Sequence, residues 1–304
     1  MEILVKEKGI NSIKFFLAYK GSFMINDELP LEGFKKCKTL GAVPMVHAEN
    51  GDAVAEGQKR IFDLGITGPE GHGLSRPPML EGEATSRAIR LASFVNVPLY
   101  VVHVMSIDAM EEIAKAQKSG QAVVGEAVVS GLVLDDSTLW DPDFTTAAKY
   151  VMSPPIKKVG HGKALQVALS TGILKLVGTY HCTFNSTQKA LGIDDFRKIP
   201  NGVNGSDADT IILNHNASFE ILSSSHHSRS DINVYEGRKG KGKVKVTIVG
   251  EKVVWENGEL KVEPGSGRYI EMPPFGHLFS GIGKADAAYL SSLRAPVYRV
   301  RSAT

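Results

Sequence analysis

The chain has 304 residues, and its 35 basic and 33 acidic side chains give a formal net charge of +2. This balance argues against a nucleic-acid partner, and no run approaches the ~18 consecutive apolar residues that a membrane span needs. The hydrophobic fraction of 42% is typical of a globular protein, and two cysteines, Cys37 and Cys182, are too few for a disulfide framework. We therefore expect a small-molecule substrate and, because no targeting segment is recognised, a cytoplasmic location by default.

The first two thirds of the chain alternate short apolar runs with segments of helical periodicity, which is typical of βα units and a parallel sheet. The residues before Gly9 resemble the end of an amphipathic helix, and Gly41, Gly65 and Gly120 are expected to end helices. We predict strands over residues 13–19, 43–48, 99–104, 122–127 and 174–180. We predict helices over residues 27–40, 52–64, 83–95, 107–118 and 163–169.

The pattern changes after residue 206. Two runs, 244–249 and 253–262, are typical of antiparallel strands, with a hairpin turn at 256–258. A polar segment between the two regions, rich in Ser, His, Gly and Lys over 223–243, is expected to loop over the surface. The fold class we predict is α/β: an incomplete (β/α)₈ TIM-type barrel over residues 1–205, since closure needs eight strands, and a small C-terminal β module and tail over residues 206–304.

Lys14 stands in an apolar run where a buried ammonium without a partner would be costly. One interpretation is an exposed lysine on an amphipathic strand. The other is a neutral amine, its pKa lowered by burial and nearby cations, that has reacted with carbon dioxide to give a carbamate bridging two metals.

His47 and His103 each stand at the end of a predicted strand, where barrel enzymes carry their catalytic groups. Alone, each could be a hydrogen-bonded core histidine, whereas together they make a metal site more credible, because zinc accepts imidazole nitrogens. His226 and His227 also invite a metal interpretation, but neighbouring histidines in a Ser-rich loop are more often solvated.

Seven segments of the sequence resemble dihydropyrimidinases, and their residues are most like those of the plant enzymes. The resemblance covers nearly the whole chain. The segments are residues 10–21, 46–52, 67–78, 100–104, 149–155, 178–185 and 199–205.

This resemblance implies zinc-dependent hydrolysis of the cyclic amide 5,6-dihydrouracil or dihydrothymine to N-carbamoyl-β-amino acids, a step of pyrimidine catabolism. It implies that Lys14 is the carbamylated bridge between two zinc ions and that His47 and His103 bind one of them. It further implies that Tyr19 stabilises the oxyanion, while Ser153 and Asn201 hold the ring amide through backbone groups. Members of the family are usually tetramers, so a homo-oligomer is expected.

The sequence departs from the family in three places. No His-x-His pair is present for the other zinc ion. Tyr180 stands where the family has a catalytic aspartate, and a phenol with a usual pKa of about 10 is a poor base near neutral pH. Asn204 and Gly205 run directly into Ser206, whereas the family places a further stretch of roughly fifty residues there for a last barrel helix.

These departures leave three hypotheses open. The chain is an enzyme with impaired activity, an inactive fragment, or a non-enzymatic assembly protein like the collapsin response mediator proteins. Lys14, His47 and His103 argue against the last, since an assembly protein does not need them. We expect Lys14, His47 and His103 to meet at one end of the sheet, and Tyr180 to be non-functional as a catalytic residue.

Overall fold

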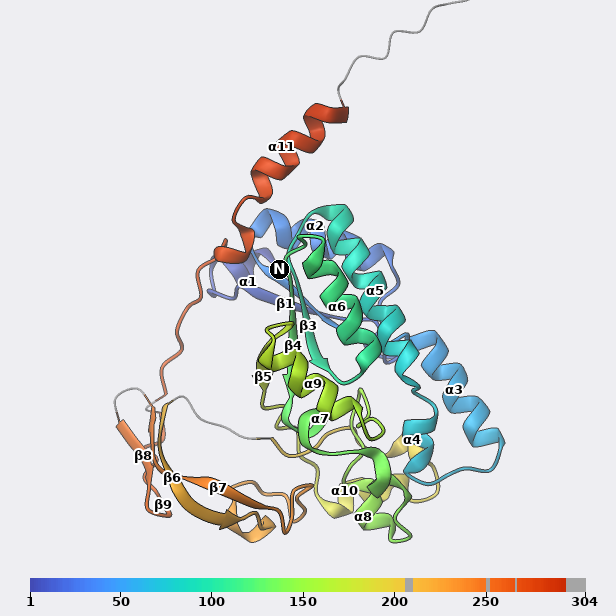
Figure 1. Cartoon of the computed structure of the whole chain (residues 1–304), viewed down its shortest axis with the longest axis vertical. Helices are drawn as coiled ribbons and strands as arrows, with labels where there is room; N and C mark the ends of the chain where they lie inside the picture. The colour runs from blue at the N-terminus through green and yellow to red at the C-terminus, as the bar shows by residue number, and fades with distance from the viewer. Residues whose placement is uncertain (206–209, 250–251, 266, 294–304) are drawn as a thin grey trace, which may run out of the picture.

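The computed structural model describes residues 1–205, 210–249, 252–265 and 267–293. A five-stranded parallel sheet with the strand order β1-β2-β3-β4-β5 forms its centre (Figure 1). Each strand therefore pairs with the next one along the chain, as right-handed crossovers on a single side produce. The strands are β1 (Ser12–Phe16), β2 (Val43–His47), β3 (Leu99–Val104), β4 (Val123–Val128) and β5 (Leu174–Gly178).

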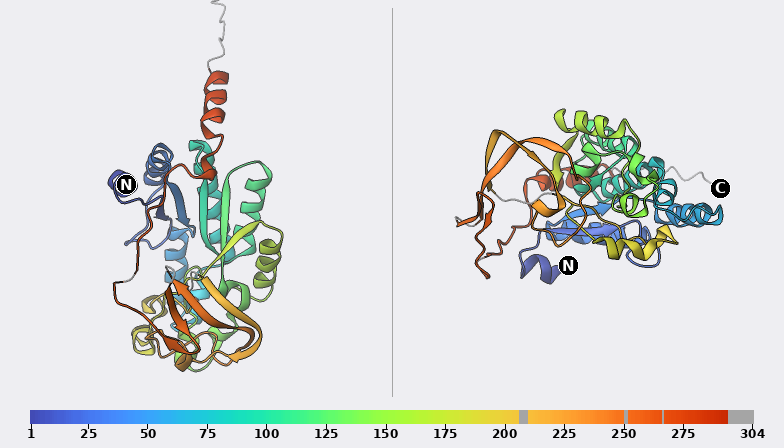
Figure 2. Two further views of the ribbon diagram at one scale, coloured as in Figure 1. Left: turned by 90° about the vertical axis from the view of Figure 1, so that its left-hand side faces the viewer. Right: turned by 90° about the horizontal axis from the view of Figure 1, so that it is seen from below.

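Four crossover helices, α2, α5, α6 and α9, stand side by side against one face of the sheet (Figure 2). Shorter helices follow the strand ends or join the longer ones. The α-helices are α1 (Glu2–Lys6), α2 (Glu28–Leu40), α3 (Gly51–Asp63), α4 (Glu70–Leu74), α5 (Pro78–Val95), α6 (Ile107–Lys118), α7 (Val129–Val133), α8 (Phe144–Ala148), α9 (His161–Ser170), α10 (Ser186–Lys189) and α11 (Ile282–Leu293). The 3₁₀ helices are η1 (Asp136–Trp140), η2 (Ala190–Gly192), η3 (Phe196–Lys198), η4 (Ser223–Ser225) and η5 (His277–Phe279).

The predicted strands and helices of the first region are confirmed within a few residues. Strand β3 and helix α6 begin and end at the predicted residues, and Gly41 ends α2 in the left-handed conformation. Helix α5 begins at Pro78, five residues before the prediction, because proline is favoured in the first turn of a helix. Strands β1 and β5 end before the predicted Tyr19 and Tyr180, both of which have positive φ angles.

The hydrophobic core lies between the sheet and its helices. Side chains on the helix-covered face, such as Phe15, Val46, Leu99 and Leu174, are buried in one cluster. Their neighbours on the opposite face are more accessible: Met45 is half-buried and Lys14 is exposed. The strands alternate in burial as a sheet with one well-covered face requires.

The fold is thus a mixed α/β fold with a parallel sheet, as predicted. Closure into a barrel is not seen among the described residues, because β1 and β5 form the two edges of the sheet. The open edge of β1 borders a hollow of about 590 Å³ lined by Phe16, Phe23 and Leu29 among others.

A second, antiparallel sheet with the order β6-β7-β8-β9 follows: β6 (Thr210–Glu220), β7 (Lys239–Val249), β8 (Lys252–Glu256) and β9 (Glu259–Leu260). The hairpin turn is confirmed, since Asn257 and Gly258 both have positive φ angles between β8 and β9. Strand β6 is not among the predicted strands. The predicted boundary between the two regions, at residue 206, adjoins residues 206–209, which lie outside the described residues.

The predicted surface loop over 223–243 is wrong at its end, because β7 already begins at Lys239. The alternating glycines and lysines pair with β6, where Phe219 faces Gly240. A Cβ atom at Gly240 would lie 2.7 Å from the Phe219 ring, so the missing side chain lets the ring pack on the strand. The lysines of this segment are exposed, which gave it the composition of a loop.

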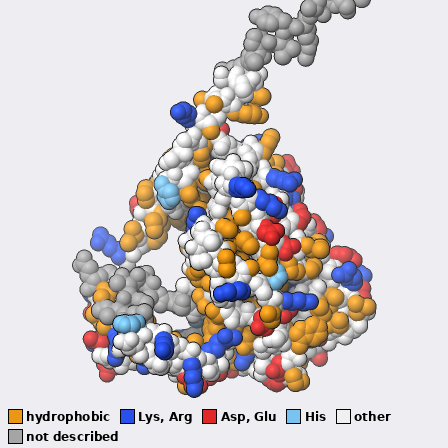
Figure 3. All heavy atoms as spheres, viewed as in Figure 1, with side chains coloured by type: hydrophobic (Ala, Val, Ile, Leu, Met, Phe, Trp, Pro, Cys, Tyr) orange, Lys and Arg blue, Asp and Glu red, His pale blue; other side chains and the backbone are white. Residues whose placement is uncertain are grey.

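The C-terminal segment returns to the amino-terminal ends of the strands. The Met272 N–H donates to Gly9 O and the Phe275 N–H donates to Gly41 O, both at 2.8 Å. A Cβ atom at Gly41 would lie 2.5 Å from Phe275, so this contact requires a glycine. Beyond it, α11 stands out from the body (Figure 3). Its Tyr289 side chain is exposed. No helix of the described residues is long and apolar enough to cross a membrane.

Candidate active site

Four aromatic or imidazole rings form a row at the carboxyl ends of the strands. The ring centroids lie 5.1 Å apart for Tyr19 and His47, 4.5 Å for His47 and His103, and 5.4 Å for His103 and Tyr180. These residues come from β1, β2, β3 and β5 and the turns that follow. The parallel order of the strands therefore places four of the sequence-predicted site residues next to one another.

Three of these four residues have strained backbones. Tyr19, His103 and Tyr180 have φ angles of 66°, 41° and 50°, in the left-handed region that side-chain-bearing residues rarely adopt. At His103 the pairing of β3 with β4 shifts between Val101 and Val104. Each such residue costs on the order of 1–3 kcal/mol, and such strain gathers at functional sites, where it directs side chains into the site.

His103 is buried, and neither of its ring nitrogens has a hydrogen-bond partner in the protein. Burial lowers its pKa well below the usual value, and the neighbouring His47 and Lys14 lower it further. The ring is therefore neutral near pH 7. Buried polar atoms are almost always paired, and a neutral imidazole with unpaired nitrogens has the chemistry of a metal ligand.

His47 is also buried, and its Nε2 lies 2.8 Å from Glu49 Oε2. Burial acts to raise the pKa of Glu49, but the hydrogen bond to His47 and the charges of Arg76 and Lys157 hold that pKa below its usual value. A carboxylate on one nitrogen fixes the orientation of the ring and leaves Nδ1 for another partner, as in metal-bound histidines.

Lys14 lies on the same face of β1 as Phe16, with its Nζ 5.0 Å from the centroid of the Phe16 ring. The Phe16 ring in turn stacks on His47. The side chain is exposed toward the open edge, yet partial desolvation lowers the pKa of Lys14, while Glu126 of β4 acts against this. Each interpretation of Lys14 therefore has one observation in its favour: the side chain is accessible, and its amine is more easily deprotonated than usual.

The three predicted substrate-binding residues, Tyr19, Ser153 and Asn201, line one cavity of about 190 Å³. Asn201 contributes a buried Oδ1 atom without a partner. Burial raises the pKa of Tyr19 to about 12, with a contribution from nearby Glu49, so its phenol stays protonated and can donate a hydrogen bond. The cavity is small and polar, with Arg76 on its wall.

Tyr180 contacts both His103 and the Ser153 backbone. Its hydroxyl donates a hydrogen bond of 2.9 Å to the carbonyl oxygen of Ser153, and its ring packs edge-on against His103. Burial raises the pKa of Tyr180 above its usual value, with smaller contributions from Tyr19 and Cys182. A phenol that keeps its proton and already donates it cannot accept a proton from water near neutral pH.

Sequence reasoning missed four buried polar or charged residues: Glu49, His72, Arg76 and Lys189. The first three line the cavity. It also missed Glu126, which is half-buried on β4. His72 Nε2 lies 2.7 Å from Met152 O, and Arg76 Nη1 lies 3.1 Å from His72 Nδ1. Glu49 follows His47 within one recognised segment, and His72 and Arg76 lie in another, so the segments themselves were the available signal. Nothing in the local pattern of Glu126 or Lys189 marks them.

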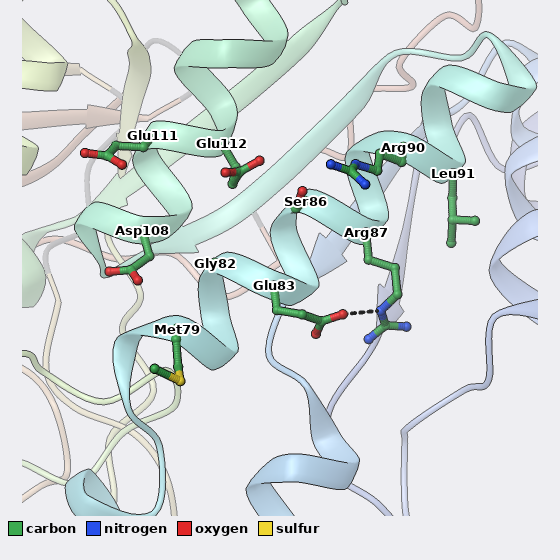
Figure 4. Close-up of a pocket in the computed structure, with 10 residues that line it drawn as sticks. All are labelled: Met79, Gly82, Glu83, Ser86, Arg87, Arg90, Leu91, Asp108, Glu111 and Glu112. Atoms are coloured by element: carbon green, nitrogen blue, oxygen red, sulfur yellow. Dashed lines mark hydrogen bonds and ion pairs between the residues drawn. The ribbon is translucent and has the colours of Figure 1, made fainter.

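A larger hollow of about 620 Å³ lies between α5 and α6, away from the strand ends (Figure 4). Its walls carry both signs of charge, and Glu83 pairs with Arg87 across one turn of α5. Because these charges are accessible to water, the residues that line this hollow include no buried, unpaired group comparable with His103.

The residues present fit one metal ion better than two. The imidazole rings of His47 and His103 are adjacent, and the ring nitrogens of His103 have no hydrogen-bond partner in the protein. Among the described residues no cluster of three or more His, Cys, Asp or Glu side chains could hold a metal ion, and this includes His226 and His227. Catalytic zinc sites usually have three protein ligands, so His47 and His103 alone leave such a site one ligand short.

No family model matches the chain. It is 68% identical to a dihydropyrimidinase of Arabidopsis thaliana over 349 aligned positions, covering 99% of this chain and 66% of that protein. It is 43% identical to a dihydropyrimidinase of Dictyostelium discoideum, covering 97% of this chain and 68% of that protein. The chain spans about two thirds of the length of these relatives. The alignment of 349 positions exceeds the 304 residues of the chain, so residues of the relative are missing inside it.

Among solved structures, the dihydropyrimidinase of Brevibacillus agri is similar, with a TM-score of 0.87 and 36% identity. That likeness covers 91% of this chain and 70% of the other. Most of the chain therefore has a fold already seen in a protein of known structure.

Proposed function

Since the chain belongs to the dihydropyrimidinase family, we propose that its strand-end site is a cyclic amidohydrolase site whose hydrolytic activity is impaired. The substrate class is 5,6-dihydrouracil and dihydrothymine, and the products are N-carbamoyl-β-amino acids. The observation that carries this proposal is His103, buried beside His47 with both ring nitrogens unpaired.

The proposed architecture follows from the same relationship. The five-stranded sheet would be a consecutive part of a (β/α)₈ barrel over residues 1–205, and residues 206–304 would form a β module and tail. The consecutive strand order and the helices on one face support this, because a barrel has both. The face left open would be the barrel interior.

One zinc ion would be held by His47, His103 and Lys14, with Lys14 as a carbamate. Such an ion supplies a Lewis acid and lowers the pKa of a bound water. Glu49 orients His47, and the lowered pKa of Lys14 favours the neutral amine that reacts with carbon dioxide. A second ion lacks its histidine pair, which is the first reason to expect impaired activity.

The substrate ring would lie in the cavity between Tyr19, Ser153 and Asn201. Tyr19 keeps its proton and stabilises negative charge on the ring carbonyl oxygen, as donors in oxyanion holes do. Tyr180 would both lack the basicity to move a proton and occupy the Ser153 carbonyl that a ring N–H needs. This is the second reason to expect impaired activity.

The test measures zinc affinity of the purified chain by competition with a chromophoric chelator, with and without bicarbonate. We expect His103→Ala to weaken zinc binding by about 100-fold or more, and bicarbonate to strengthen binding in the unaltered chain but not in Lys14→Met. His227→Ala, at an exposed histidine, is the matched control. Zinc binding that is the same in His103→Ala and His227→Ala would refute the proposed site.

Turnover separates an impaired enzyme from an inactive one. We expect negligible hydrolysis of dihydrouracil by the chain and by Tyr180→Asp, because repairing one member of a catalytic unit recovers little when another is missing. A longer version of Tyr180→Asp, with the segments missing relative to the family restored, should regain activity. Zinc-dependent turnover in either short form, abolished by His103→Ala, would contradict the impairment.

The alternative function is a catalytically inactive protein that acts through assembly. The Tyr180 bond to the Ser153 carbonyl favours it, because that bond occupies a backbone group that the substrate ring would need. It predicts a stable homo-oligomer, such as a tetramer, whose formation is independent of zinc. Light scattering on the zinc-free and zinc-loaded chain distinguishes the two.

A further inference from the structure

Lys189 is a buried lysine whose side chain is only 2% exposed. It ends the short helix α10, and its Nζ donates three hydrogen bonds to backbone carbonyls: 2.8 Å to Val151, 2.7 Å to Pro200 and 2.9 Å to Gly202. An ammonium has three N–H donors, so all of them are used. Taking such a group out of water is costly, and the three bonds offset that cost by giving every donor a partner.

The three carbonyls belong to the two segments that line the candidate substrate cavity. Pro200 and Gly202 are the residues on either side of Asn201, and Val151 lies two residues before Ser153. The two segments also meet directly, since the Gly202 N–H donates to Val151 O at 3.0 Å. A single side chain therefore joins the backbone that presents Asn201 to the backbone that presents Ser153.

We propose that Lys189 is a positioning residue that sets the spacing of the Asn201 and Ser153 segments and thereby shapes the cavity for a small cyclic amide. The ligand class rests on the proposed function. The link that Lys189 makes between the two segments, called the clamp below, rests on the three hydrogen bonds. Lys189 is not among the residues that line the cavity, and its three hydrogen bonds go to backbone carbonyls, so it acts through the backbone.

The clamp depends on the charge of Lys189. A neutral amine has two N–H donors and one lone pair, so one of the three carbonyls would lose its donor. Burial lowers the pKa of Lys189 to about 7, while the nearby Cys182 acts to raise it. The other groups facing the ammonium are the Phe184 ring, 5.7 Å away, and His72, whose pKa is held well below its usual value by burial and by Arg76. The clamp should therefore weaken as the pH rises above about 7.

The test compares the unaltered chain with Lys189→Met, which keeps the length of the side chain and removes its donors. Lys198→Met is the matched control, because Lys198 lies in the same region but is exposed. Hydrogen exchange of the Gly202 amide, which donates to Val151, is followed by NMR from pH 6 to 9 and corrected for the intrinsic rate. Dihydrouracil binding is measured by calorimetry on the same samples.

We expect Gly202 exchange to be about tenfold faster or more in Lys189→Met at pH 6, and unchanged in Lys198→Met. In the unaltered chain, corrected exchange of Gly202 should rise with pH, whereas in Lys189→Met it should stay fast throughout. Dihydrouracil affinity should fall by about tenfold in Lys189→Met.

Equal Gly202 protection in all three proteins would overturn the clamp. If Lys189→Met does not fold, the pH profile of the unaltered chain decides, and protection that is independent of pH overturns the proposal. If dihydrouracil fails to bind the unaltered chain, the proposed function is wrong, while the exchange profile still decides whether Lys189 joins the two segments.

Discussion

The two faces of the five-stranded sheet have opposite surroundings. On the helix-covered face, Val46 and Leu99 are fully buried in a continuous apolar cluster. On the open face, paired residues of neighbouring strands include Lys14, Met45 and Tyr100, all at least partly accessible. Parallel sheets usually have both faces covered, so the open face is the unusual one.

This difference separates the residues that stabilise the fold from those that could take part in chemistry. The covered face carries the core that holds the sheet together. The open face is buried at its carboxyl end, where His47 and His103 lie. Polar residues there can be strained and unpaired because the covered face supplies the stability to hold them.

The largest effect should come from the covered face. Phe34 of α2 is fully buried, and its ring packs edge-on against Phe15 at 5.3 Å. Phe34→Ala should lower the free energy of unfolding by about 3–5 kcal/mol, because it leaves a cavity in the core. Met45→Ala on the open face should cost about 1 kcal/mol or less. Denaturant unfolding of both variants checks this, and equal losses would mean that the open face is covered in solution.

A pH effect should follow from Glu81, which is buried in the first turn of α5 and accepts a hydrogen bond from the Met105 N–H. Burial raises its pKa to about 7 from 4.5, although Lys157 acts against this. Because the folded chain holds this proton more tightly, the stability it contributes is present below about pH 4.5 and lost as the pH rises through about 7. Glu81→Gln should remove that loss and gain about 1–3 kcal/mol at pH 8. Parallel unfolding-against-pH curves for the two proteins would contradict it.

A smaller effect is expected where the open face meets the cavity. Tyr180→Phe removes the bond to the Ser153 carbonyl but keeps the ring against His103. The free energy of unfolding should fall by about 1 kcal/mol, while the freed carbonyl should strengthen dihydrouracil binding a few-fold. Thermal unfolding and calorimetry measure the two changes on one sample. Weaker binding in Tyr180→Phe would show that the phenol helps to bind the ligand.

The smallest change in stability is expected at the open edge of β1. Phe23 is 64% exposed beside the hollow at that edge, and an unpaired strand edge favours association. Phe23→Ser should leave the free energy of unfolding within about 0.5 kcal/mol, yet reduce self-association. Light scattering at micromolar concentration is the measurement. A monomeric unaltered chain would remove the reason to expect association there.

Much of the parallel region could be predicted from the sequence, because local signals agree with the fold there. Helix α6 begins after the Ser106 cap and α2 ends at Gly41, and both places carry the residue that the backbone requires. The family resemblance then identified Tyr19, Ser153 and Asn201, which the structure brings to one cavity. Their proposed roles stay predictions.

Other features depend on contacts between distant segments and leave no local pattern. The left-handed backbone of His103 follows from the shift in strand pairing, and Lys189 looks like any surface lysine until its three carbonyl partners are known. The first residues of β7 have the composition of a loop because their lysines face solvent. Backbone pairing with β6 nevertheless makes them a strand. Tertiary contacts override composition in each case.

The return of the C-terminal segment has a consequence for the order of folding. The Asn11 side chain donates to Pro273 O across 262 positions of sequence, and Asp286 pairs with Lys38. During synthesis these contacts can form only after almost the whole described chain has left the ribosome. The amino-terminal ends of the strands therefore stay uncovered for most of that time, and a chaperone that binds exposed apolar segments would find its target there.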